Sequence, residues 1–168
     1  MKKIVLVLFL VPFLLFAQDV EKSTLTKEGQ TVPTFKVKTI DGKTINIKAL
    51  RGKVVLINFF ATWCGPCMNE MPRVEKELWE KYRKEGLVVV AIGRGHNQAE
   101  LLKFKKEKGF TFPIAPDAKR QVYGLFATNF IPRNYVIDRE GKIVLQGMGY
   151  TEEEFGKLKS EIEKLLKK

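Results

Sequence analysis

The chain has 168 residues, of which 45% are hydrophobic and 29% are charged, and its formal net charge is +11. This composition excludes a low-complexity or repeat protein and fits one globular domain that can bury a core without disulfides. The lysines are scattered or paired with glutamates at helical spacing, as Glu77 and Lys81 are. The basic charge therefore predicts a solvated surface and no nucleic-acid partner.

The first residues are typical of a secretory signal peptide. Two lysines precede an apolar run at residues 4–16, and Ala17 offers a small residue before a cleavage point. The run is shorter than the roughly 20 apolar residues of a membrane span. We predict a signal peptide at residues 1–17 and a periplasmic or otherwise extracytoplasmic protein, with an uncleaved membrane anchor as the alternative. Residues 18–31 are expected to be a flexible lead-in, and residues 32–168 the folded domain.

The domain is predicted to open with a hairpin and a buried strand. Asp41-Gly42 separates two alternating runs at residues 35–48, which is a strong signal for a two-residue hairpin turn. The continuous apolar run at residues 54–60 favours a strand buried on both faces. Beyond it, apolar residues recur every three or four positions up to Gly86, which predicts an amphipathic helix.

A second buried strand is expected at residues 87–92. The pair Asn97 and Glu100 is typical of a helix start, and Gly109 is expected to end that helix. A short strand at residues 110–114 follows.

The last third is predicted to contain two helices and two strands. A helix is expected at residues 117–126, and strands at residues 134–138 and 142–148 are joined by a turn. A capping box of Thr151 and Glu154 opens the last helix, whose buried face carries Phe155, Leu158, Ile162 and Leu165. The order of elements predicts an α/β fold, in which a central mixed sheet is covered by helices on both faces.

Two cysteines, Cys64 and Cys67, lie in the stretch FATWCGPCMNEMP and are the only ones in the chain. A structural zinc site needs four ligands, and the lone His96, expected to be solvated, adds at most one, so no metal is expected. A purely structural disulfide closing four residues contributes roughly 2 kcal/mol, against about 3 kcal/mol for fifteen residues. Neither a zinc site nor a structural disulfide accounts well for two cysteines separated by only two residues.

A reversible redox couple accounts for it better. The strand at residues 54–60 places Cys64 at the start of a helix, where free N–H groups and the helix dipole stabilise a thiolate. Gly65 permits close approach of another backbone, and Pro66 lacks an N–H that a first helical turn does not need. Cys67 lies one turn inward, so Cys64 is expected to attack and Cys67 to resolve.

The motif WCGPC after an apolar strand, together with the segment FIPRNYVID, resembles the thioredoxin superfamily. More narrowly, the chain from about Thr31 onward is similar to the TlpA/ResA-like extracytoplasmic thiol–disulfide oxidoreductases. This resemblance implies a thioredoxin-like fold with an N-terminal β-hairpin and a βα insertion. It also implies that Pro132, in Ile131-Pro132, is a cis-proline facing the cysteines.

Further roles follow from the resemblance. Pro72 matches a helix proline that kinks the helix. Glu70 matches an acidic residue near the cysteines and is the candidate for proton transfer with Cys67, at a position expected to be partly exposed. An ordinary solvated glutamate is the alternative. Trp63 is expected to contact partners, although it could simply cover the end of the sheet.

The sequence departs from the thioredoxin pattern at three positions. Asn58 replaces a buried aspartate and cannot shuttle a proton, and Phe60 replaces a tryptophan. Arg133 follows the cis-proline, where a small polar residue is usual, which puts partner specificity in doubt. The expected substrate-binding residues are Trp63, Gly65, Pro66, Ile131 and Arg133.

The function implied is a secreted thiol–disulfide oxidoreductase that reduces disulfides of partner proteins. It needs no metal or organic cofactor, and a membrane thiol–disulfide electron donor would restore its dithiol. A monomer is expected. The alternatives are a disulfide oxidase or isomerase, a thiol peroxidase of the same fold, and a redox-inert binding module.

Overall fold

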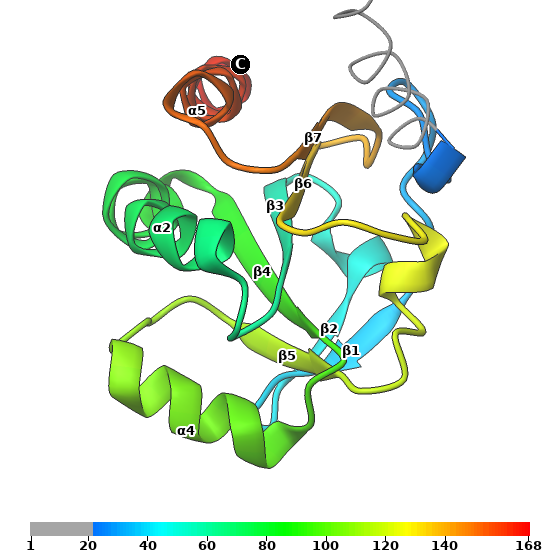
Figure 1. The fold of residues 1–168 in the computed structure, drawn as a ribbon. Helices are drawn as coiled ribbons and strands as arrows, with labels where there is room; N and C mark the ends of the chain where they lie inside the picture. Colours follow the sequence, from blue (N-terminus) through cyan, green and yellow to red (C-terminus); the bar gives the residue numbers. More distant parts are fainter. Residues whose placement is uncertain (1–21) are drawn as a thin grey trace, which may run out of the picture.

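The computed structural model describes residues 22–168, so the predicted signal peptide at residues 1–17 lies outside the described part. A five-stranded sheet forms the centre (Figure 1). Its strands lie in the order β5 (Ile114–Asp117), β4 (Leu87–Arg94), β3 (Val54–Phe60), β6 (Arg133–Ile137) and β7 (Ile143–Met148). β3, β4 and β5 are parallel, and β6 and β7 pair antiparallel, which confirms the predicted mixed sheet.

The central strand β3 carries the sequence VVLINFF, and all seven of its residues are buried. Alternate side chains enter two different cores. Val54, Leu56 and Phe60 join a core beneath the helices, whereas Val55 and Phe59 join the core on the opposite face. A strand with two covered faces needs apolar residues at nearly every position, so the continuous run is explained.

The long helix after β3 is not uniform. It begins as α2 (Gly65–Arg73), with Pro72 inside it, and continues as a π-helical stretch at Val74–Trp79. It then passes through α3 (Glu80–Tyr82) and a 3-10 turn. Gly86 ends it with φ of 102°, as predicted, because glycine adopts this left-handed conformation without a steric penalty. The wider π-helical turns begin two residues after Pro72, where the resemblance implied a kink.

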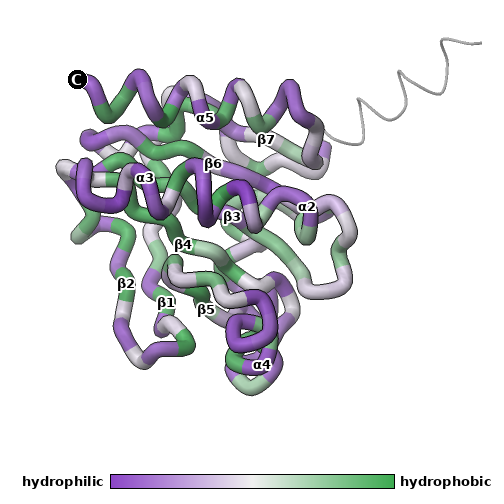
Figure 2. Tube along the Cα trace, turned by 90° about the vertical axis from the view of Figure 1, so that its left-hand side faces the viewer, coloured by the Kyte–Doolittle hydropathy of each residue, from purple (hydrophilic) through white to green (hydrophobic). Residues whose placement is uncertain are grey.

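Two further helices complete the domain. α4 (Gln98–Lys108) begins with a full capping box between Asn97 and Glu100. Thr151 is the N-cap of α5 (Glu152–Leu166) and accepts the Glu154 N–H, which is one of the two hydrogen bonds of the predicted capping box. Figure 2 shows hydrophobic and hydrophilic residues alternating along α5. Its four predicted core residues are all buried, which gives the helix one apolar face against the sheet.

The expectation of helices on both faces is wrong in one respect. Apolar residues of α2, α4 and α5 all belong to the core beneath one face of the sheet. The opposite face is covered by the hairpin β1 (Lys36–Lys38) and β2 (Thr44–Asn46) and by short 3-10 turns (Figure 1). The hairpin turns at Gly42, where φ is 84°. It supplies the apolar cover that helices were expected to give.

The helix predicted at residues 117–126 is also wrong. Only Tyr123–Leu125 forms a 3-10 turn, and the strand expected at residues 110–114 lies at Ile114–Asp117. The carboxylate of Asp117 accepts the backbone N–H groups of Val122 and Tyr123, and Arg120 has φ of 55°. The Asp117 carboxylate thus takes backbone N–H groups that a helix would use, and Arg120 has a left-handed backbone conformation. Both features replace the hydrogen bonding of a regular helix.

The lead-in is not loose over residues 22–31. The backbone N–H of Leu25 donates to the carbonyl of Phe126. The N–H of Gly29 donates to the carbonyl of Ile143, and the N–H of Ile143 donates to the carbonyl of Gln30. The segment therefore lies along the domain as part of it. Residues 18–21 fall outside the described part of the chain.

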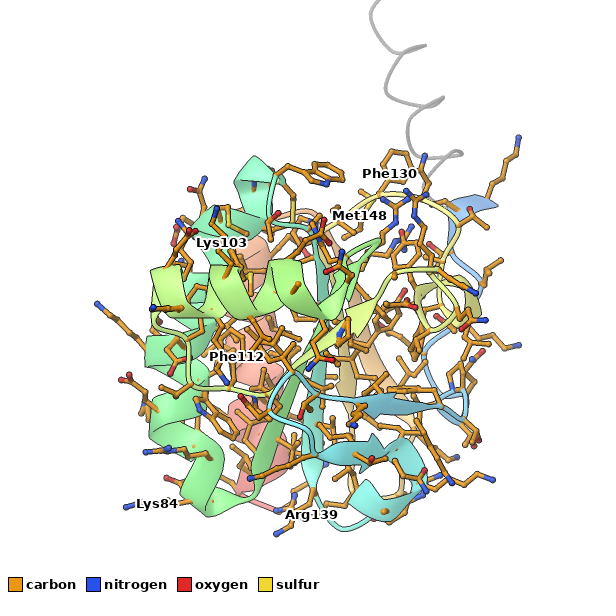
Figure 3. The ribbon with its side chains drawn as sticks, turned by 90° about the horizontal axis from the view of Figure 1, so that it is seen from below. Lys84, Lys103, Phe112, Phe130, Arg139 and Met148 are labelled. Carbon is orange, nitrogen blue, oxygen red and sulfur yellow. A yellow bond between two sulfur atoms is a disulfide. The ribbon has the colours of Figure 1, made fainter. Side chains whose placement is uncertain are left out.

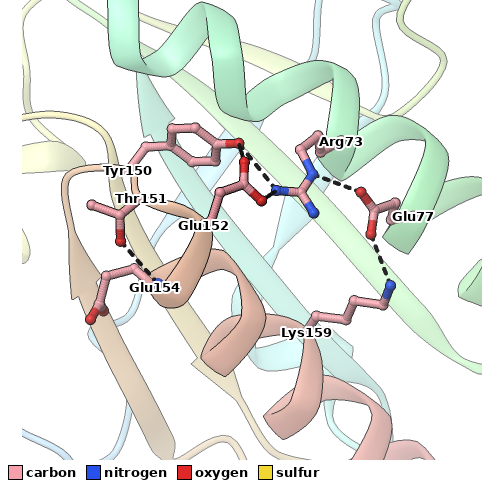
Figure 4. A network of polar contacts seen from close by, with 7 residues as sticks. All are labelled: Arg73, Glu77, Tyr150, Thr151, Glu152, Glu154 and Lys159. Carbon is pink, nitrogen blue, oxygen red and sulfur yellow. Dashed lines mark hydrogen bonds and ion pairs between the residues drawn. The ribbon is translucent and has the colours of Figure 1, made fainter.

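A polar network joins α2 to α5 (Figure 4). The Arg73 guanidinium donates to Glu77 at 2.7 Å and to the Tyr150 hydroxyl at 3.2 Å, and it also bonds Glu152. Glu77 accepts a further bond from Lys159 at 2.8 Å. Partly exposed ion pairs contribute little individually, but together they fix the helix that carries the cysteines.

Candidate active site

The two cysteines lie where β3 gives way to α2. They are joined as a disulfide, with their Cα atoms 5.3 Å apart. Cys64 is the N-cap residue of α2, and the backbone N–H of Cys67 donates to its Sγ at 3.3 Å. Cys64 is 6% exposed and Cys67 is fully buried. The order of exposure is the one expected from the sequence, with Cys64 the outer sulfur.

The local electrostatics favour negative charge on Cys64. At a helix start the first N–H groups lack helical partners, and the helix dipole places partial positive charge there. The bond from Cys67 already points one such donor at Sγ. On reduction, the same donor would stabilise a Cys64 thiolate.

The Ile131-Pro132 peptide bond is cis and faces this sulfur. The carbonyl oxygen of Ile131 lies 3.8 Å from Sγ of Cys64. A disulfide sulfur carries no proton, so in this oxidised state the approach is a packing contact. In the reduced protein, a Cys64 thiol could donate to this oxygen.

An exposed rim surrounds the disulfide. Trp63 is 69% exposed, Gly65 and Pro66 are exposed, and Ile131 is half-buried. Figure 3 shows Phe130, next to Ile131, at the opposite end of the molecule from Lys84 and Arg139. The four rim residues are thus available to a partner that reaches Cys64, and the side chain of Trp63 covers little of the sheet end.

Glu70 was expected to be partly exposed, and this expectation is wrong. The residue is buried, with an exposed fraction of 2%. It lies on α2 one turn after Cys67 and points toward the sheet. Asn58 Nδ2 donates to Glu70 Oε2 at 2.9 Å, and Asn134 Nδ2 donates to Oε1 at 2.6 Å. Asn58 also donates to Asn134 Oδ1 at 2.8 Å, which closes a ring of three hydrogen bonds. The alternative of a solvated helix glutamate is wrong.

Burial raises the pKa of Glu70 from 4.5 to about 7, and the bonds from Asn134 and Asn58 oppose part of that rise. Desolvation disfavours the charged carboxylate, whereas amide N–H donors favour it. In this ring of hydrogen bonds, each carboxylate oxygen of Glu70 accepts one amide N–H. The Oδ1 atom of Asn58 is buried without a partner, so it remains free to accept a proton donor. The group is therefore able to exchange a proton near neutral pH.

Asn134 was not predicted from the sequence to be a site residue. Asn58 was noted only because it replaces a buried aspartate and cannot shuttle a proton. Asn58 and Asn134 face each other in the antiparallel register of β3 and β6. Both are polar residues in strands that are otherwise almost wholly apolar and buried. A polar residue that interrupts each of two buried strands is the signal that could have found the pair.

Arg133 is not available to a partner as expected, because its side chain turns away from the rim. It is 3% exposed. Its guanidinium donates to the Asn129 carbonyl at 2.9 Å, to the Thr24 hydroxyl at 2.9 Å and to the Ser23 hydroxyl at 2.6 Å. It thus ties the segment before the cis-proline to the start of the described chain.

His96 is also buried, at 7% exposed, and so is not the solvated loop histidine that was expected. Among residues 22–168, no group of three or more histidine, cysteine or acidic side chains is placed to hold a metal ion. The groups gathered at the start of α2 are the two sulfurs and, one turn further on, Glu70.

Comparison with known proteins agrees with this geometry. Residues 29–146 match the AhpC/TSA family. The thiol-disulfide oxidoreductase ResA of Bacillus thuringiensis (strain Al Hakam) is 36% identical over 134 residues, which cover 80% of this chain and 75% of the relative.

Two solved structures share the fold. A protein from Bacteroides thetaiotaomicron proposed to be a protein disulfide isomerase is 37% identical, with a TM-score of 0.83 over 87% of this chain and 94% of that one. A proposed thiol:disulfide interchange protein DsbE from Chlorobium tepidum is 29% identical, with a TM-score of 0.74 over 83% and 98%. The chain therefore belongs to the AhpC/TSA family and is a thioredoxin-like thiol–disulfide oxidoreductase of the ResA-like group.

Proposed function

We propose that the protein is a reductant of disulfides in partner proteins outside the cytosol. The observation that supports this most is the joint placement of Cys64, Cys67 and Glu70. An outer sulfur sits at a helix start, an inner sulfur is buried one turn on, and a buried carboxyl that can exchange a proton follows.

In the first step, the Cys64 thiolate attacks one sulfur of the partner disulfide. A mixed disulfide forms between Cys64 and the partner, and the second partner sulfur leaves as a thiolate that takes up a proton. The Cys67 N–H and the helix start favour the attacking thiolate. The exposed rim of Trp63, Gly65, Pro66 and Ile131 contacts the partner chain during this step.

In the second step, Cys67 resolves the mixed disulfide. Its thiol proton passes to Glu70, and the Cys67 thiolate attacks Sγ of Cys64. The bond between Cys64 and the partner breaks, and the reduced partner leaves. Two electrons have then moved from the dithiol to the partner, and the product is the Cys64–Cys67 disulfide of this structure.

The proposed location outside the cytosol rests on the sequence of residues 1–17. A signal peptide at residues 1–17, or an uncleaved anchor there, would place the domain in the periplasm or at the outer side of the membrane. Among the described residues, none of the helices has both the length and the apolar character needed to cross a bilayer. A membrane thiol–disulfide donor would return two electrons to the disulfide after each turnover, and the domain would act as a monomer.

An oxidase or isomerase is the second candidate, because the Bacteroides thetaiotaomicron relative is itself proposed to be a disulfide isomerase. The reduction potential separates the two. We expect a value near about −270 mV, as for thioredoxin, whereas a strong periplasmic oxidant lies near −120 mV. A value above about −180 mV, measured against glutathione, would remove the reductant role and favour the second candidate.

Trapping of partners tests the assignment of the sulfurs. Cys67→Ser should accumulate mixed disulfides with partners through Cys64, and Cys64→Ser should not. The reverse pattern would overturn the assignment. A redox-inert binding module would show no fast-alkylating thiol near neutral pH in the reduced protein, and a peroxidase would consume peroxide at a rate that partner disulfides do not match.

A further inference from the structure

His96 is the single histidine of the chain, and the redox mechanism above does not use it. It follows β4, and its side chain is buried beside the segment that leads from β3 to Cys64. The ring contacts both neighbouring segments, because Nε2 meets Thr62 and Nδ1 meets Glu100.

The hydrogen bonds of the ring define its tautomer. The backbone N–H of Thr62 donates to Nε2 at 3.1 Å. A backbone N–H can only donate, so Nε2 must carry a lone pair. Nδ1 lies 3.4 Å from Oε2 of Glu100 on α4, which places the ring proton between Nδ1 and that carboxylate. The neutral ring thus has a partner at each nitrogen.

The bond at Nε2 reaches the attacking cysteine through a single turn. The Cys64 N–H donates to the Ala61 carbonyl at 3.1 Å, which closes a turn with Thr62 and Trp63 at its centre. Thr62 is therefore two residues from Cys64, and its backbone N–H is bonded outside the turn, to His96. The ring links this turn to the loop after β4 and to α4.

We propose that His96 is a positioning residue for attack by Cys64, because its neutral ring holds the Ala61–Cys64 turn through the Thr62 N–H. The proposal rests on the proposed redox function of Cys64. The Thr62 hydroxyl lies 3.4 Å from the same ring nitrogen, so both polar groups of Thr62 that face His96 meet Nε2.

Two residues meet the ring nitrogens among the described residues. Glu100 lies at Nδ1, and its Oε2 also accepts the Asn97 N–H at 2.7 Å, so its position is fixed at the start of α4. Thr62 presents its N–H and its hydroxyl to Nε2. The hydrogen bond from the Thr62 N–H is therefore the contact through which the ring acts on the turn before Cys64.

Two substitutions in a Cys67→Ser background separate positioning from packing. His96→Leu removes the acceptor, whereas His96→Gln keeps an acceptor near Nε2. The readout is the second-order rate of Cys64 with a small aromatic disulfide at pH 7.5, divided by the thiolate fraction from ultraviolet absorbance. Gln98→Leu adds a leucine at the exposed start of α4 and serves as the control.

We expect His96→Leu to lower the thiolate-corrected rate about tenfold, the cost of one unmet hydrogen bond in the transition state. His96→Gln should keep at least half of the rate at pH 7.5. A His96→Leu rate equal to that of the control would overturn the proposal. So would a Gln variant as slow as the leucine variant.

A measurement on the unmodified protein does not depend on how the variants fold. The nitrogen-15 spectrum of the lone histidine should show the tautomer with its proton on Nδ1 at pH 8, and a proton on Nε2 would contradict the proposal. If Cys64 with His96 intact does not react with the disulfide at all, the redox function itself fails. If it reacts and the leucine variant reacts equally fast, only the role of His96 fails.

Discussion

Glu70 and Arg133 are buried ionisable side chains on opposite faces of one sheet, and both are held by neutral groups. Glu70 lies on the helix side and is bonded by the amides of Asn58 and Asn134. Arg133 precedes Asn134 on β6 and points the other way, to the hydroxyls of Ser23 and Thr24 and the carbonyl of Asn129. One strand therefore supplies a residue to each site.

The two sites differ in what their charges can do. A guanidinium keeps its proton throughout the physiological range, so Arg133 can only hold segments together. The pKa of Glu70, raised by burial to about 7, lets its carboxyl gain or lose a proton under working conditions. We therefore propose that the proton chemistry lies on the helix side of the sheet, and that Arg133 on the other side supports the segment before the cis-proline.

The largest effect should follow the loss of the Glu70 proton site. Glu70→Gln keeps the size of the side chain and its capacity to bond, and we expect resolution of the mixed disulfide to slow about 100-fold, as for the loss of a general base. Single-turnover release of a labelled partner measures it. Glu80→Gln makes the same charge change at an exposed site on α3 and should leave the rate unchanged. Equal rates for both variants would show that another group moves the proton.

Stability should depend on pH through the same residue. The folded pKa of about 7 lies above the ordinary 4.5, so folding favours the protonated acid. This contribution is fully present below about pH 4.5 and is lost as the pH rises to about 7. Relative to Glu70→Gln, the oxidised wild type should lose roughly 3 kcal/mol of unfolding free energy across that window. Urea denaturation at several pH values measures it, and parallel curves for the two proteins would contradict the assignment.

Arg133 should affect stability without affecting the proton chemistry. Arg133→Met keeps most of the length but leaves the acceptors on Ser23, Thr24 and Asn129 without this donor, so we expect a loss of about 1–3 kcal/mol. The pH profile of resolution should keep its midpoint. Lys84→Met, at an exposed position at the opposite end of the molecule from Phe130 (Figure 3), should cost much less. A shifted midpoint in Arg133→Met would show that the two sites are coupled.

The smallest effect should come from Asn134. Asn134→Ala removes the donor to Glu70 Oε1, which currently favours the charged carboxylate. We expect the midpoint of the resolution profile to rise by about one pH unit, with the carboxyl still able to act. An unchanged or lower midpoint would mean that this hydrogen bond does not tune the acid.

The fold was predictable where the signal is local. The apolar run at residues 54–60, the glycine at position 86 and the Asn97–Glu100 pair each determine a strand, a helix end or a helix start through neighbours in sequence. The helix expected at residues 117–126 failed because the Asp117 side chain takes backbone donors that a helix would use. The attachment of residues 22–31 depends on backbone bonds to distant strands, for which no local pattern exists.

The candidate active site also has parts that the sequence predicts and parts that it does not. The two cysteines and the cis-proline were predictable, because motif and spacing carry them. The burial of Glu70 depends on Asn58 and Asn134, which are 76 positions apart and meet only through the β3–β6 register. The direction of Arg133 could not be read, because all five residues of β6 are buried and hydropathy does not show which face each one takes.

The most direct test is a titration of the Glu70 carboxyl itself in the oxidised protein. Difference infrared spectra between pH 4 and 9, with Glu70→Gln subtracted, isolate its protonated C=O band. The account predicts that this band disappears with a midpoint near 7, the value that burial among two amides gives. A midpoint near the ordinary 4.5 would mean that Glu70 is fully ionised at neutral pH, and its role as the acid exchanging protons with Cys67 would then be contradicted.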